Sequence, residues 1–229
     1  LSDQLFAQPE GATSALAILG AVAFTIQIYA DFSGYSDMAV GLGRLMGFRL
    51  MYNFNLPFFA VTPSDFWRRW HISLSQCLRD NLYIPMGGNR FGYGREMFAL
   101  MTTMLIGGLW HGAQWHFVLW GAYCGGLLVL ERAVRLSFGG DALLRPGLQG
   151  SLGSRLSHIA VMFPLTVIGF VIFRAETVAD IGHVFRSMTN GLGDFDVARH
   201  QLKEVFFCSA VLIGYQVGHY LTNDRFFVF

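Results

Sequence analysis

The sequence predicts an all-α, polytopic membrane helix bundle in which some helices are re-entrant or broken. Hydrophobic residues fill 53% of the 229 positions, and the mean hydropathy is +0.44. Charged residues fill only 14%, against about 25% in soluble domains. Four apolar blocks approach or exceed the length of about 20 residues that crosses a bilayer core. We therefore expect residues 1–229 to be one partial membrane domain, a fragment of a longer chain.

Three of the four apolar blocks have the length of a single membrane span. They cover residues 12–30, 156–173 and 205–221. The remaining block, residues 97–130, would form a helix of about 51 Å, well beyond the hydrocarbon thickness of about 30 Å. It must tilt strongly, break or turn back. Both of its flanks are basic, and a hairpin path would place both on the cytoplasmic side.

Two histidines lie in the middle of this uncharged block. Gly107, Gly108 and Gly112 surround His111, and glycine lets a helix kink or another backbone approach closely. A polar side chain at membrane depth is costly, so it indicates a functional site that faces a cavity or the bundle interior. His116 lies about 140° further around an ideal helix, so the pair lacks the i, i+4 spacing of zinc ligands. A structural role fits His116 better than His111.

An arginine-rich segment precedes the block. Residues 44–95 contain seven arginines but only two acidic residues, a net charge of +5. Within this segment, Thr62 resembles an N-cap, Pro63 suits the first helical position and Asp65 adds an acid to the first turn. These residues predict a helix that runs to about Asp80.

That helix would place a histidine among aromatic side chains. Trp67, His71 and Ser75 would form a row at i, i+4 and i+8, with Trp70 beside it. The other faces would carry arginines that reach lipid headgroups or an anionic partner. These arginines are Arg68, Arg69 and Arg79.

Three segments occur in an order that resembles the membrane-bound O-acyltransferases. They are QIYADFSGYSDMAVGLGRLMGF, DFWRRWHISLSQCLRDNLYIPMGGNR and GGLWHGAQWHFVLWGA, and together they cover about residues 27–121. The greatest similarity is to the bacterial branch that contains the alginate O-acetyltransferase membrane subunit. The resemblance implies that residues 27–121 form the catalytic core, in a funnel or tunnel within the membrane. It also implies that His111 matches the catalytic histidine and that His71 matches the second motif histidine.

The activity implied by the resemblance is O-acyl transfer. An acetyl or other acyl group would move from a cytoplasmic thioester, such as acetyl-CoA, towards hydroxyls of an exported polysaccharide such as alginate. We expect His111 to be the general base and His71 to position a reactant or polarise the acyl carbonyl, because a buried neutral histidine can accept a proton. No serine or cysteine is linked by motif to either histidine, which disfavours a covalent acyl-enzyme. The further candidates for substrate binding or positioning are Asp65, Trp67, Trp70, Ser75 and Trp110.

The resemblance also implies a setting for the reaction. We expect a multi-pass protein of the bacterial inner membrane that contacts lipid, an acyl donor or carrier, and a polysaccharide acceptor. Periplasmic or extracellular acetyltransferase partner proteins are expected to complete the transfer. We expect no bound cofactor, no metal and no nucleic acid.

Three other classes of protein remain open. A transporter or channel would also place histidines and broken helices at mid-membrane, but more often has paired intramembrane carboxylates. Asp31 and Asp37 are the nearest candidates for such a pair. A haem-binding electron carrier would use His71 and His111 as axial ligands and would show a Soret band. A scaffold subunit would need the histidines only for packing.

Overall fold

The structure is a computed structural model, and every regular element in its described part is a helix. The chain divides into two compact units, which are described separately. One unit comprises residues 1–34 and 174–229, and the other comprises residues 35–173. The structure describes residues 2–8, 10, 12–137, 151–191, 193 and 195–222.

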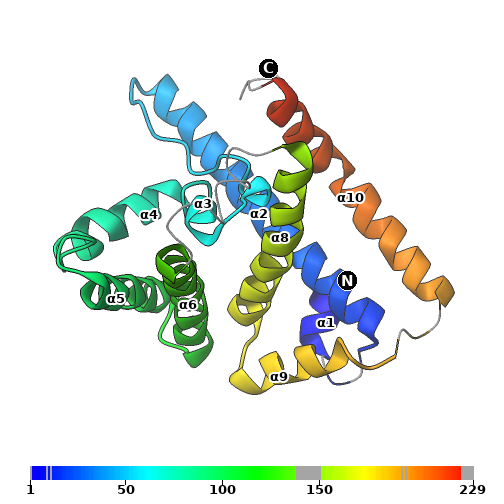
Figure 1. The fold of residues 1–229 in the computed structure, drawn as a ribbon. Coiled ribbons are helices and arrows are strands. Elements are labelled where there is room, and N and C mark those ends of the chain that lie inside the picture. The colour runs from blue at the N-terminus through cyan, green and yellow to red at the C-terminus, as the bar shows by residue number, and fades with distance from the viewer. Residues whose placement is uncertain are drawn as a thin grey trace. The chain divides into compact units, whose positions relative to one another are not determined.

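The first unit contains helices from both ends of the chain. The Ser14 hydroxyl, at the start of α2, donates to the Asn190 carbonyl at 2.7 Å. Thr177 and Asp180 form a reciprocal capping box at the start of α9. The helices are α1 (Ser2–Ala7), the first part of α2 (Ser14–Leu45), α9 (Val178–Ser187) and α10 (Phe195–Thr222) (Figure 1).

The second unit contains both motif histidines and every other site residue predicted from the acyltransferase motifs. Short helices come first and longer ones follow. Besides the end of α2, its elements are the 3₁₀ turn η2 (Pro57–Phe59), α3 (Pro63–Trp67), α4 (Ile72–Leu78), the π-helical turn η3 (Arg79–Tyr83), α5 (Tyr93–His111), α6 (Trp115–Ser137) and α8 (Leu152–Arg174), which ends at the unit boundary.

The long apolar block turns back on itself, as its length predicts. Helices α5 and α6 pack side by side as a hairpin, with the turn directly after His111 (Figure 1). Glycines permit this close approach. A Cβ atom on Gly108 would clash with the Phe117 carbonyl oxygen, and one on Gly121 would lie 2.5 Å from the Met104 carbonyl oxygen. Gly108 and Gly121 therefore allow the backbones of α5 and α6 to approach each other closely.

Three helices in the described part of the chain are long and apolar enough to cross a membrane. They are α2, α6 and α8. The blocks predicted at 12–30 and 156–173 fall in α2 and α8, and most of the second half of block 97–130 forms α6. The block at 205–221 lies in α10, which is not among the three, so its membrane span stays a prediction.

The single helix expected from Thr62 to about Asp80 is wrong, although its start is confirmed. Thr62 Oγ1 accepts the Asp65 N–H at 3.1 Å, and Pro63 is the first helical residue. Helix α3 ends after one turn at Trp67, and α4 begins at Ile72. Between them His71 has φ 43° and ψ 54°, a left-handed conformation that is rare for a residue with a side chain. The expected row of Trp67, His71 and Ser75 therefore does not exist.

An upstream asparagine loop explains the interruption. The Ile72 N–H donates to the Asn53 carbonyl at 3.0 Å, and the Asn55 N–H donates to the Arg69 carbonyl at 2.9 Å. The Asn53 side chain also accepts the Ser73 hydroxyl at 2.6 Å. These long-range partners compete with the hydrogen bonds of a continuous helix, and they hold a conformation that costs roughly 1–3 kcal/mol.

Candidate active site

His111 is the last residue of α5 and lies inside an aromatic cage. Its ring centroid is 4.9 Å from Trp110, 5.2 Å from Trp120 and 5.0 Å from Phe173. Phe117 stacks at 6.1 Å. The rings come from α5, α6 and α8, so three helices converge on one half-buried imidazole. The surroundings of the imidazole on this side are therefore aromatic and apolar.

His71 reaches the same place from the break between α3 and α4. Its ring centroid lies 6.1 Å from Trp110, the tryptophan that also contacts His111. Its Nδ1 atom lies 3.5 Å from Ser73 Oγ. The structure therefore brings together the two histidines on which the resemblance rests, although 40 positions separate them in the sequence.

The environment favours the neutral form of His71. This residue lies outside the three candidate spanning helices. Burial, and secondarily the charge of His111, lowers the pKa of His71 from 6.5 to about 4. At neutral pH its imidazole is therefore uncharged and can both donate and accept a hydrogen bond.

The predicted tryptophans differ in their surroundings. Trp67 packs edge-on against Trp120 with ring centroids 5.8 Å apart, which links α3 to the cage of His111. Trp70 is buried against Phe54 at 5.0 Å and Phe170 at 4.9 Å, so its contacts are those of a core residue. The third, Trp110, is 62% exposed while it contacts both histidines.

Asp65 and Ser75 also have distinct surroundings. The carboxylate of Asp65 is buried, accepts the Val61 N–H at 3.2 Å and pairs with Arg69 Nε at 2.9 Å. These contacts hold the start of α3. The Ser75 hydroxyl donates to the Trp70 carbonyl at 3.3 Å and lies at the wall of a cavity.

This cavity, called the polar cavity below, has a volume of about 590 Å³. It is lined by residues of α3, α4, η3, α5 and α6 and is open on one side. Trp67 lies in its wall as well as against Trp120, so the cavity adjoins the aromatic cage. The charged residues of its lining are Arg68, Arg79, Glu96, Glu131, Arg132 and Arg135, a net charge of +2.

The two carboxylates of the polar cavity are both buried and both paired with arginine. Glu96 accepts Arg132 Nε at 3.0 Å, and Glu131 accepts Arg135 Nη2 at 2.7 Å. By contrast, Arg68 is exposed and forms no ion pair with another described residue. Its guanidinium is therefore available to an anionic ligand.

Sequence reasoning missed this charged lining of α5 and α6. Glu96 and Glu131 flank the uncharged block, and Glu131 stands four residues before Arg135, the spacing of a helical ion pair. The spacing indicates an ion pair at the end of a helix. It does not indicate that Glu96 and Glu131 face the same cavity as Arg68, because that depends on the packing of α5 against α6.

The remaining polar candidates are not among the residues that line the polar cavity. His116 is buried against Phe117, with ring centroids 4.1 Å apart, and its Nδ1 has no hydrogen-bond partner in the described residues. Asp31 and Asp37 are exposed on α2. In the described ranges, no group of three or more His, Cys, Asp or Glu side chains could hold a metal ion.

Fold and site define an α-helical membrane protein with a histidine pair beside an arginine-lined cavity. The chain belongs to the MBOAT, membrane-bound O-acyltransferase family, whose sequence model matches residues 11–152. That range includes His71, His111 and the charged lining of the polar cavity.

Individual relatives carry more specific names. The chain is 45% identical over 218 residues to "Probable alginate O-acetylase AlgI" of Pseudomonas aeruginosa, covering 95% of this chain and 38% of the relative. It is 48% identical over 115 residues to the peptidoglycan O-acetyltransferase of Helicobacter pylori, covering 49% and 21%. It is 33% identical over 117 residues to the teichoic acid D-alanyltransferase of Streptococcus thermophilus, covering 48% and 28%. The chain thus spans less than two fifths of the length of these relatives.

Proposed function

We propose that this chain is the catalytic core of an inner-membrane O-acyltransferase of a bacterium. It moves an acetyl group from a thioester donor such as acetyl-CoA towards hydroxyls of an exported polysaccharide such as alginate. The observation that carries the proposal is the meeting of His71 and His111 at Trp110. Family membership and the names of the relatives support the reaction class.

The chemistry needs a base because an alcohol is a poor nucleophile until its proton is removed. In the proposed step, His111 accepts the proton of the acceptor hydroxyl while the hydroxyl oxygen bonds to the acyl carbon. The carbon–sulfur bond then breaks, and the leaving thiolate takes the proton back from His111. His71 positions a reactant or donates a hydrogen bond to the acyl carbonyl.

Direct transfer is favoured over a covalent acyl-enzyme. Ser73 is the hydroxyl that lies 3.5 Å from His71 Nδ1, but its proton is donated to Asn53 Oδ1 at 2.6 Å. A serine nucleophile would need to give that proton to a base. In this proposal, a hydroxyl of the polysaccharide, or of a partner that passes the acyl group on to it outside the membrane, attacks the thioester directly.

A transfer assay with the full-length parent protein tests this function. Acetyl-CoA labelled in the acetyl group is supplied to the cytoplasmic face of inverted membrane vesicles that contain the protein and its partners. We expect ester-linked label on the polysaccharide, in an amount that depends on the protein. The same assay is run with a His111→Gln variant. Unchanged ester formation in that variant is the result expected of a transporter or scaffold, and it would contradict the proposal.

The polar cavity is our candidate entrance for the donor, and Arg68 is its test. The Arg68→Glu variant replaces an exposed guanidinium of the cavity lining with a carboxylate. The carboxylate has the same sign of charge as the phosphates of acetyl-CoA and repels them. Loss of a charge-assisted hydrogen bond costs about 1.5–3 kcal/mol, so we expect transfer at limiting acetyl-CoA to fall roughly 10- to 100-fold. The rate is measured against acetyl-CoA concentration in the vesicles.

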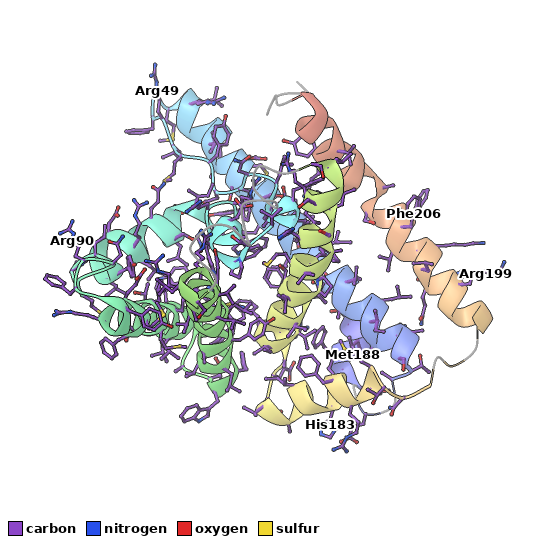
Figure 2. All side chains as sticks on the ribbon, viewed as in Figure 1. Arg49, Arg90, His183, Met188, Arg199 and Phe206 are labelled. Carbon is purple, nitrogen blue, oxygen red and sulfur yellow. The ribbon has the colours of Figure 1, made fainter. Side chains whose placement is uncertain are left out.

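The control is Arg90→Glu, because Arg90 is exposed, does not line the cavity and points outward from its loop (Figure 2). Equal effects of the two reversals would contradict a donor site in the cavity. Arg69 is not an equivalent target. It pairs with Asp65 and donates to the Asn55 carbonyl at 3.3 Å, so its reversal should lower membrane abundance instead.

A further inference from the structure

Glu131 is a buried carboxylate that the proposed chemistry does not use. It lies on α6, a candidate membrane span, and is 6% exposed. An ionised side chain in such a place is costly unless it is paired and hydrogen-bonded. The structure supplies partners from two directions, one on its own helix and one on α3.

Both oxygens of Glu131 are fully engaged. Oε2 accepts the backbone N–H and the hydroxyl of Ser64, each at 2.7 Å. Oε1 accepts Nη2 and Nε of Arg135, at 2.7 Å and 3.1 Å. A carboxylate offers about four acceptor positions, and four donors occupy them here. Through these four contacts Glu131 joins α6 to the start of α3.

The bond to Ser64 completes the start of α3. The first N–H groups of a helix have no partner within it, and Ser64 is the second residue of α3. Thr62 serves the N–H of Asp65 from within the segment, whereas Glu131 serves that of Ser64 from another helix. A helix of one turn has little stability of its own, so such contacts determine where α3 lies.

Helix α6 touches α3 a second time, next to the histidine cage. Trp120 and Glu131 are 11 residues apart, which places them within about 20° of each other on the face of α6. Trp120 packs edge-on against Trp67 of α3 at 5.8 Å and lies 5.2 Å from His111. One face of α6 thus fixes the start of α3 through Glu131 and receives its end through Trp120.

We infer that Glu131 is a positioning residue for acyl transfer. By holding Ser64, it sets the place of α3, and with it Trp67 and the following His71 segment, relative to His111. The inference rests on the proposed function, because its readout is transfer. It assigns the role to the hydrogen-bond acceptor that Ser64 needs, and not to the negative charge of Glu131.

Two substitutions of similar size separate the acceptor from the charge. In Glu131→Gln the amide oxygen can still accept from Ser64, whereas Glu131→Met has no oxygen. At saturating acetyl-CoA, we expect Glu131→Gln to retain most of the transfer rate per unit of protein. Glu131→Met should lose about 10- to 100-fold, the scale expected when reacting groups are displaced by about 1 Å. Ser64→Ala should lower the rate in the native background and much less in Glu131→Met.

The assay uses vesicles with the full-length parent at matched membrane abundance, with Glu176→Met as the control at an exposed carboxylate. Equal loss in Glu131→Gln and Glu131→Met would overturn the inference and assign the role to the charge. Native rates per unit of protein in both variants would also overturn it. His111→Gln in the same vesicles separates the two levels: if it transfers normally, the proposed function itself is wrong.

Discussion

Adding a single methyl group at Gly121 is expected to disrupt the α5–α6 hairpin. In Gly121→Ala the new Cβ would lie 2.5 Å from the Met104 carbonyl oxygen and 3.1 Å from Leu105 Cα. Both are backbone atoms, so the two helices must separate. Overpacking of this kind costs typically about 1–3 kcal/mol. We expect lower membrane abundance and a lower melting temperature in detergent, together with a loss of transfer because Trp120 and His111 lie along this contact.

Gly126→Ala is the matched control on the same helix. A Cβ at this position meets no atom within 4 Å. Alanine favours a helix interior over glycine by about 1 kcal/mol, so the control should leave stability unchanged or raise it. The two substitutions are chemically identical, but we expect Gly121→Ala to lower the stability and Gly126→Ala to leave it unchanged or raise it. A hairpin that tolerates both equally would contradict the close packing of α5 on α6.

Replacement of His111 should have the largest effect on the chemical step. In His111→Gln the side chain keeps a polar end of similar reach but cannot take the hydroxyl proton. General base catalysis is typically worth about 10²- to 10⁴-fold, so we expect a loss of that order in the transfer rate at saturating donor. The rate is measured in vesicles as ester-linked label per unit of full-length protein.

His116→Gln is the comparison for this loss. His116 lies five residues further along the chain and is buried, but it is outside the contacts that join His71, Trp110 and His111. We expect a transfer rate per unit of protein close to the native one, even if membrane abundance falls. A loss as large as that of His111→Gln would show that the assay reports disruption of the hairpin and not removal of a base.

Local signals predicted part of this architecture correctly. The length of residues 97–130 and their central glycines predicted a break or a turn, and the hairpin confirms it. The predicted N-cap at Thr62 is also confirmed, because capping depends on neighbours within a few positions. The membrane class follows from composition alone.

The features that failed or were missed depend on contacts between distant segments. Helix propensity favoured continuation past Trp67, but Asn53 and Asn55 bind the intervening backbone and allow His71 its left-handed conformation. In the sequence, Glu131 marks only the end of an apolar block. Its proposed positioning role depends on the hydrogen bond from Ser64, which lies 67 positions away. Pairings of this kind leave no periodic signal in a single sequence.

The most direct test of the central claim is the acetyl ester content of the exported polysaccharide in cells that produce the full-length parent. Native protein and His111→Gln are compared at equal membrane abundance, in cells without another copy of the protein. If His111 is the base at the break between α5 and α6, ester content should fall to the level of cells that lack the protein. Native ester content in His111→Gln would contradict the account and leave the histidine a packing role in the aromatic cage.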